Sequence, residues 1–392
     1  MSEAYIVAAV RTAGGKRNGR LSGWHPVDLA AEVLNELVKR TGVDPVLVED
    51  VIMGCVGQFG QQSMNIARNA VLASVLPETV PGTTLDRQCG SSQQAVHFAA
   101  QAVQSGAMDI VIAAGVESMS RVPMFSPFSH AEKLGLGSYT SPTVSERYNG
   151  VTFSQFTGAE MMAKKYGLSK DELDIFALQS HQRAKAATEA GLFRDEILPV
   201  EARLIDGSKP GDLHTVDEGI RFNATLDGIA NVKLLNEGGV VTAANASQIC
   251  DGATGVMIVN ERGLKALGVK PLARIHKMAV IGSDPMLMLE TPVQATELVL
   301  KKAGMSISDI DLYEVNEAFA SVSLAWLKTL KADPERLNVN GGAIALGHPL
   351  GASGTKLMTT LVHALGQRGK RFGLQTMCEF AGMANATIIE RL

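Results

Sequence analysis

The chain has 392 residues but few cysteines and no long apolar run. Its four cysteines are Cys55, Cys89, Cys250 and Cys378. Four are too few for a disulfide framework, and none has CxxC spacing or a nearby histidine pair, so we expect reduced thiols and no metal site. No stretch approaches ~18 apolar residues, and neither end carries a signal peptide or a peroxisomal address. We therefore expect a cytoplasmic protein that does not enter a membrane.

Charge is sparse as well. Charged residues make up 19% of the chain and the formal net charge is -4, which argues against nucleic acid as a partner. A local basic patch is compatible with this balance, so a phosphorylated small ligand is not excluded. Hydrophobic residues make up 46%, enough for the cores of two or three domains.

Strands and helices alternate near the N-terminus. The apolar stretch “AYIVAAV” (4–10) predicts a buried strand, and “VEDVIMGCV” (48–56) predicts another. Between them, “PVDLAAEVLNELVKRTG” has helical periodicity and ends at Gly42, a suitable C-cap. This alternation indicates an α/β fold with a layered sheet.

Two blocks far apart in the chain share one order of features. Residues 83–120 contain a short strand, the small-residue corner after Cys89, an Ala-rich helix to about Gln104 and an apolar strand ending in glycine. Residues 337–382 repeat the corner, the helix, the polar turn and the strand. The shared order predicts a duplicated domain.

The segment between the two blocks differs from both. Residues 125–150 are rich in turn formers and lack a period, so we expect a long loop there. A helix follows, with Ser169 and Glu172 as a capping box and Gly191 at its end. The predicted division is 1–118 with 250–270 as the first half, 119–249 as an inserted loop domain, and 271–392 as the second half.

Cys89 lies between a predicted strand and a predicted helix. A thiol at a helix N-terminus is close to the positive end of the helix dipole, which lowers its pKa and favours the nucleophilic thiolate. A small buried hydrophobic role is the alternative, as for most free cysteines. Cys55 and Cys250 lie in or beside apolar stretches, and we expect both in the core.

His348, Asn316 and Cys378 are further candidates. Pro349 restricts His348 to extended geometry, and such a histidine orients a thiolate, donates to an oxyanion, or is an ordinary turn residue. Asn316 ends an apolar strand before a helix, so it is either an N-cap or a polar group that holds water or a carbonyl. Cys378 ends a strand of the second half, and all of these could meet in one crevice. The glycines around His348 do not match a dinucleotide-binding fingerprint.

Together these stretches resemble the thiolases, which exchange acyl groups on coenzyme A. The resemblance covers essentially the whole chain. It rests on “RQCGSSQQA” around Cys89, “NASQICDGA” at 245–253, “NEAFA” at 316–320, “NVNGGAIALGHPLGASG” around His348, and “MC…G…IIERL” around Cys378. The related ketoacyl synthases usually rely on two histidines with their cysteine, and “NEAFA” and Cys378 argue against them.

The resemblance implies a duplicated thiolase fold, five-layered αβαβα, with an inserted loop domain that binds coenzyme A. It also implies a homo-oligomer, dimer or tetramer, that has coenzyme A as a substrate and no permanently bound cofactor. Cys89 would be the acylated nucleophile, and Cys378 the general acid. His348 and a water on Asn316 would form one oxyanion hole.

Three further positions come from the same resemblance. The backbone N–H groups of Cys89 and Phe380 would form the second oxyanion hole. Ser247 matches a position beside the pantetheine arm of coenzyme A. Arg221 matches a basic residue near the adenine nucleotide, with a solvated surface charge as the alternative.

The sequence departs from the family in two places. At “FSQFTGAE”, Phe156 and Thr157 replace the Met-Gly of many short-chain thiolases, and the stretch is similar to actinobacterial enzymes of steroid breakdown. This predicts a bulky or branched acyl group. At Phe380-Ala381-Gly382 the family usually has glycines, so Phe380 would be strained if that position requires positive φ.

Three functions are compatible with these residues. The first is an active thiolase that cleaves a 3-oxoacyl-CoA to acetyl-CoA and a shortened acyl-CoA. The second is a thiolase-fold acyl-CoA enzyme whose activity or specificity is altered by Phe380-Ala381. The third is a non-catalytic acyl-CoA-binding protein, against which the joint presence of Cys89, Asn316, His348 and Cys378 argues.

Overall fold

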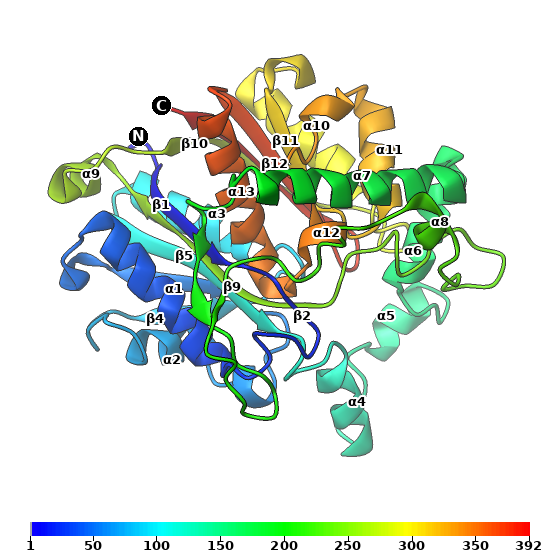
Figure 1. Ribbon diagram of the computed structural model, residues 1–392, viewed down its shortest axis with the longest axis horizontal. Helices are drawn as coiled ribbons and strands as arrows, with labels where there is room; N and C mark the ends of the chain where they lie inside the picture. Colours follow the sequence, from blue (N-terminus) through cyan, green and yellow to red (C-terminus); the bar gives the residue numbers. More distant parts are fainter. Residues whose placement is uncertain (1) are drawn as a thin grey trace.

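The structure is a computed structural model that describes residues 2–392. Its main sheet has the strand order β11-β12-β13-β10-β1-β9-β5-β3-β4, and helices cover both of its faces (Figure 1). The strands of the first half are β1 (Tyr5–Thr12), β3 (Asp50–Gly54), β4 (Gly82–Leu85), β5 (Ile110–Ser118) and β9 (Cys250–Val259). Those of the second half are β10 (Ala273–Gly282), β11 (Leu312–Val315), β12 (Phe372–Glu379) and β13 (Met383–Arg391).

The two halves have one topology. In the first half β4, β3 and β5 are parallel, and β9 and β1 follow antiparallel. In the second half β11 and β12 are parallel, β13 and β10 follow antiparallel, and a parallel bridge from Tyr313 to Leu337 stands where β4 stands in the first. Antiparallel pairing of β1 with β10 joins the halves. The predicted duplication is confirmed.

The helices form three layers around the strands. The central layer contains α3 (Ser91–Ser105) and α13 (Ser353–Gln367), which pack against each other, and α13 contacts strands of both halves. One outer layer contains α1 (Pro26–Thr41) and α2 (Ile66–Leu72) on the first half. The other contains α10 (Thr291–Ala303), with α11 (Ala320–Leu330) packed beside it. This gives the expected order of helix, strand, helix, strand and helix layers.

Local signals explain where several of these elements start and stop. α1 begins with Pro26, which needs no N–H donor there, and ends at Gly42, whose φ of 63° only glycine adopts without strain. The strands β1, β5 and β9 are buried nearly throughout, as their continuous apolar sequences predict. Cys55 and Cys250 are buried in the core, as expected.

The inserted segment contains α6 (Gln155–Tyr166), α7 (Lys170–Glu189), α8 (Leu226–Ala230) and a small sheet of β7 (Val200–Glu201) and β8 (Leu213–His214). In Figure 1 the inserted segment extends from α6 and α8 at the right, along α7 across the middle of the view, to a green loop beside the first half. The capping box of Ser169 and Glu172 is present at the start of α7, and Gly191 follows its end with a φ of 70°.

The expected loop over 125–150 is wrong in part. It contains two short helices, α4 (Ser126–Lys133) and α5 (Pro142–Arg147). Each has a proline in its first turn, where a missing N–H costs nothing, so prolines that suggested turns in fact start helices. The remaining short elements are β2 (Gly15–Lys16), β6 (Ile197–Leu198), α9 (Glu261–Leu267) and α12 (Ala343–Leu346).

No helix in the described part of the chain is both long and apolar enough to cross a membrane. Within residues 2–392, no group of three or more His, Cys, Asp or Glu side chains is placed to hold a metal ion.

Candidate active site

One pocket of about 440 Å3 brings most of the candidate residues together. Cys89, Ser247, His348, Cys378 and Phe380 all line it. They come from distant parts of the chain: the corner before α3, the end of the insertion, the loop before α13, and the end of β12. Most other lining side chains are apolar, and they include Met119, Met124, Phe156, Leu235, Ile249, Leu289, Phe319 and Leu350.

Cys89 lies on a tight corner between β4 and α3. Gln88 before it has a positive φ of 49°, and Ser91 ties the corner by accepting from the N–H of Arg87 and donating to the carbonyl of Gln88. Gly90 after it has no room for a side chain, since a Cβ there would lie 1.9 Å from a carboxyl oxygen of Glu379. The corner thus presents the thiol to the pocket at the cost of local strain.

The predicted lowering of the pKa of Cys89 is wrong for this structure. Burial raises the pKa of the Cys89 thiol well above its ordinary value, and the neighbouring Cys378 and Glu379 raise it further. The α3 dipole does not overcome these effects, because desolvation of a thiolate costs more than one helix terminus returns. Cys89 therefore needs a base beside it to become a nucleophile.

His348 is buried and both its ring nitrogens have partners. Nδ1 contacts the Ser353 hydroxyl, which donates to the carbonyl of Pro349 at 2.8 Å. Because that hydroxyl has one proton, Nδ1 is assigned the imidazole hydrogen, and Nε2 is left as the acceptor that faces the amide group of Asn316. Burial, with a contribution from the charge of Lys356, lowers the pKa of His348 to about 3. A neutral ring with Nε2 as acceptor is the form that takes a proton from a thiol.

Asn316 lies behind His348, with its Nδ2 at 3.4 Å from Nε2 of the ring. The N-cap interpretation is wrong, because α11 begins four residues later and is capped by Phe319. The Oδ1 atom of Asn316 is buried and has no hydrogen-bond partner among the described residues. An unsatisfied amide oxygen of this kind is suited to hold a water molecule.

Cys378 is buried near the end of β12 and faces the same pocket. Burial, together with Glu379, raises the pKa of this thiol to about 12. The group is thus a protonated thiol over the physiological range, which is the state that a general acid requires.

The strain predicted at Phe380 falls one residue later. In the described turn that follows β12, Ala381 has a φ of 62° and Gly382 a φ of 79°, whereas Phe380 does not have positive φ. Phe380 keeps its N–H in ordinary backbone geometry, and its half-buried ring packs on the core of the second half and lines the pocket. The departure from the family pattern therefore changes the pocket wall and places a strained alanine beside it.

Ser247 and Arg221 are not close neighbours in the structure. Ser247 lines the pocket with Cys89 and donates its backbone N–H to the carbonyl of Ala318 at 2.9 Å. Arg221 is exposed and lines a second pocket of about 470 Å3 with His181 and Thr225. Ala243 lines the first pocket, and the next residue, Ala244, lines the second. The two pockets therefore lie on either side of this short stretch of chain.

Sequence reasoning missed Glu379 and the basic pair Lys16 and Arg17. All three line the first pocket. Both carboxyl oxygens of Glu379 are buried without a partner among the described residues, and burial raises its pKa well above the ordinary value. A charged residue in a strand that is otherwise uncharged was the available signal for Glu379. For Lys16, the last residue of β2, and Arg17, which follows it, there was none.

Comparison with known proteins identifies similar chains over the full length. The thiolase N-terminal domain family matches residues 4–262, and the thiolase C-terminal domain family matches residues 269–391. A steroid 3-ketoacyl-CoA thiolase of Mycobacterium tuberculosis is 51% identical over 397 residues, which is 100% of this chain and 95% of the relative. An acetyl-CoA acetyltransferase of Chromobacterium violaceum is 44% identical over 394 residues, which is 99% of this chain and 100% of the relative. A 3-ketoacyl-CoA thiolase of Bacillus subtilis is 40% identical, covering 100% of both.

Proposed function

Since the chain belongs to the thiolase family, we propose that it is an acyltransferase that cleaves a 3-oxoacyl-CoA with coenzyme A, through an acyl-enzyme on Cys89. The observation that carries the proposal is the single pocket shared by Cys89, His348 and Cys378. A thiol that burial keeps protonated, an imidazole with an acceptor nitrogen and a candidate nucleophile therefore lie on the walls of one pocket.

The first half-reaction forms the acyl-enzyme. Nε2 of His348 takes the proton of Cys89, and the thiolate attacks the 3-oxo carbon. The N–H groups of Cys89 and Phe380 stabilise the resulting oxyanion, and such donors are each typically worth ~3–4 kcal/mol. The carbon–carbon bond then breaks, which leaves a thioester on Cys89 and the enolate of acetyl-CoA.

The enolate is stabilised and then protonated. Its oxygen accepts from the protonated Nε2 of His348 and from a water held by Asn316, while the thiol of Cys378 gives its proton to the enolate carbon. Acetyl-CoA leaves. Cys378, now a thiolate, takes the proton of an incoming coenzyme A, whose sulfur attacks the thioester. The shortened acyl-CoA departs, and Cys89 regains its proton from His348.

Coenzyme A enters as a substrate, and no permanently bound cofactor is invoked. Ser247 would lie beside the pantetheine arm, and Arg221 would bind the nucleotide end from the second pocket. Lys16 and Arg17 add two cations at the first pocket that suit phosphate groups. The domain division stated above, a homo-oligomer and a cytoplasmic location stay predictions.

For the acyl group we propose a bulky or branched chain. The supporting observation is the apolar wall, in which Phe156 and Phe319 meet edge to face at 5.8 Å and Phe380 stands nearby. The identity with a thiolase named for steroids points the same way.

The test mixes purified protein and coenzyme A with acetoacetyl-CoA, straight-chain 3-oxoacyl-CoA and a branched or ring-bearing 3-oxoacyl-CoA. Loss of enolate absorbance reports cleavage. We expect turnover, with the highest kcat/KM for the bulky substrate. Coenzyme A binding without turnover of any substrate would leave a non-catalytic binding protein instead.

A further inference from the structure

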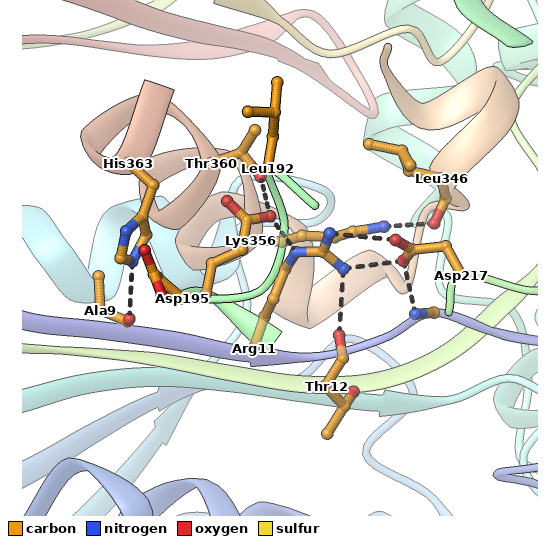
Figure 2. Close-up of polar contacts among 12 residues, drawn as sticks. Ala9, Arg11, Thr12, Leu192, Asp195, Asp217, Leu346, Lys356, Thr360 and His363 are labelled. Atoms are coloured by element: carbon orange, nitrogen blue, oxygen red, sulfur yellow. Dashed lines mark hydrogen bonds and ion pairs between the residues drawn. The ribbon is translucent and has the colours of Figure 1, made fainter. Parts of the chain in front are cut away.

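Four charged side chains meet in the interior of the protein, and Figure 2 labels three of them, Arg11, Asp217 and Lys356. They are Arg11 on β1, Glu196 and Asp217 of the inserted segment, and Lys356 on α13, and all are buried. We call them the buried charge network. None of the four lines the catalytic pocket, and none is used in the mechanism above.

Arg11 is the centre of the network. Its guanidinium donates to both oxygens of Asp217 at 2.8 and 3.0 Å, and to Glu196 at 2.6 Å. Asp217 also accepts from the backbone N–H of Gly14 at 2.7 Å, and Glu196 accepts from the hydroxyl of Thr360 at 3.1 Å. Burial alone would raise the pKa of Asp217, but Arg11 and Lys356 outweigh it and hold that pKa below its ordinary value. The carboxylate is therefore charged.

The ammonium group of Lys356 contacts backbone carbonyls rather than carboxylates. It donates to the carbonyl of Leu346 and, at 3.0 Å, to the carbonyl of Gly347. These are the last residue of α12 and the residue directly before His348. Within residues 2–392, no carboxylate forms an ion pair with Lys356. Its buried charge is thus directed at the backbone that holds the histidine.

The backbone at this point needs support. Gly347 has φ 80° and ψ 161°, a conformation that is essentially restricted to glycine. A Cβ on it would lie 2.6 Å from the sulfur of Cys250, so the peptide is confined from that side as well. Carbonyls at the end of a helix lack intrahelical donors, and a buried one without a partner is costly. Lys356 satisfies both carbonyls where no other donor to them exists in the described structure.

We propose that Lys356 is a positioning residue for His348, with Asp217 and Glu196, which Arg11 holds in place, as the counter-charges that keep its ammonium group inside the protein. The proposal rests on the function proposed above for His348. Lys356 fixes the strained peptide before the ring, so that Nε2 faces Asn316 and the pocket. Since Glu196 and Asp217 belong to the inserted segment, the same network ties that segment to the catalytic loop.

The test compares K356M, K356R and T360V with the unmodified protein. K356M keeps a similar length and removes the charge and the donors. K356R keeps both. T360V is the matched control, because Thr360 lies one turn along the same helix and donates its hydroxyl hydrogen bond to Glu196 rather than to the carbonyls of Leu346 and Gly347. Thermal unfolding establishes that each variant is folded.

We expect K356M to lower kcat by about 100-fold with KM for coenzyme A and acyl-CoA within about 2-fold, because a displacement of about 1 Å in a reacting group costs that much. K356R should recover most of kcat, and T360V should stay within about 3-fold. If K356M does not fold, K356Q replaces it. The kcat of K356Q should be measurable but lower than that of K356R. Folded neutral variants with unchanged kcat, or an equal loss in T360V, would overturn the proposal.

A second readout separates this inference from the proposed function. The rate at which iodoacetamide alkylates Cys89, followed by mass spectrometry, depends on a base beside the thiol but not on any acyl-CoA. We expect it to fall at least 10-fold in K356M and to recover in K356R. Absence of thiolysis in the unmodified protein would sink the proposed function alone, whereas unchanged alkylation in K356M would sink the role of Lys356 alone.

Discussion

Each half has a glutamate at the same topological position, and the two glutamates differ in whether their carboxyl groups are hydrogen-bonded. Three pairs of equivalent elements begin at the same separation along the chain: β3 and β11, β5 and β12, and α3 and α13. The same separation along the chain makes Glu379 the counterpart of Glu117. Glu117 accepts hydrogen bonds from the N–H groups of Val56, Gly57 and Gly351 at 2.9 to 3.0 Å. Glu379 has no partner in the described structure.

The same pairing sets Cys89 opposite Gly351 and Cys378 opposite Val116. In the first half Glu117 secures the corner at the start of α13. In the second half the carboxyl of Glu379 makes no hydrogen bond to the corner at Cys89 in the described structure. This difference is compatible with the oxyanion role that we propose for the N–H of Cys89.

The largest test of this asymmetry is C89S. Loss of the nucleophile should lower kcat by ~10⁴ or more and abolish the acyl-enzyme in mass spectrometry, because a hydroxyl is a far weaker nucleophile at neutral pH. C55A, which alters a buried core cysteine, should acylate normally. An acylated C89S protein of unchanged rate would refute the assignment.

C378S should have the next largest effect. General acid–base groups contribute ~10²–10⁴-fold, and a hydroxyl exchanges its proton poorly at this step. Because the pKa of Cys378 is about 12, its thiol stays protonated up to about pH 9, so iodoacetamide should modify it far more slowly over that range than it modifies an ordinary exposed thiol. Faster alkylation of Cys378, mapped by peptide mass spectrometry, would contradict its role as the protonated acid.

The two glutamates give a matched pair of variants. E117Q puts an amide NH₂ against backbone N–H donors, so it should lower the free energy of unfolding by ~1–3 kcal/mol while folded protein stays active. E379Q should not destabilise at neutral pH. Thermal unfolding of both variants from pH 4 to 9 measures the difference.

The direction in which stability changes with pH follows from the burial of Glu379, which raises the pKa of this carboxyl above the unfolded value of 4.5. The folded protein then binds more protons than the unfolded chain above pH 4.5, and stability falls as pH rises towards the folded pKa. E379Q has no carboxyl group to ionise at this position and lacks this loss of stability. Its free energy of unfolding should therefore be higher than that of the unmodified protein at pH 8, and equal or lower below pH 4.5. A less stable E379Q at pH 8 would show that the carboxylate is paired.

The smallest expected effect is that of F380G. Phe380 corresponds to Ser118 in the other half and narrows the pocket. Because its backbone is unstrained, glycine should leave the oxyanion hole in place and raise kcat for short substrates by a few-fold. Unchanged rates across a chain-length series would mean that the ring only packs.

Local sequence signals predicted the parts of the fold that local physics determines. The capping box of α7, the glycine that ends α1 and the buried strands needed only neighbouring residues. The small-residue corner marked Cys89, but its meeting with His348 and Cys378 is a tertiary fact that spacing does not contain. The family resemblance supplied it.

The failures have two causes, burial by distant segments and the exact residue at which a helix starts. The pKa of Cys89 and the orphan oxygens of Glu379 depend on burial by distant segments, and no window of sequence reports burial from the far side of a fold. Asn316 has the residue type of an N-cap, yet β11 continues into the catalytic loop before the helix starts. Pro127 and Pro142 break periodicity locally while they start helices.

The junction of β1 with β10 has a consequence for symmetry. Each strand has a bulge, after Ile6 and after Ile275, and matching the bulges makes Tyr5 equivalent to Arg274. These two residues are direct partners across the junction, and the contact of Ile6 with Ala273 is mirrored by that of Ile275 with Ala4. This is the contact of two identical subunits around a twofold axis. One polypeptide thus contains an internal dimer of two related halves.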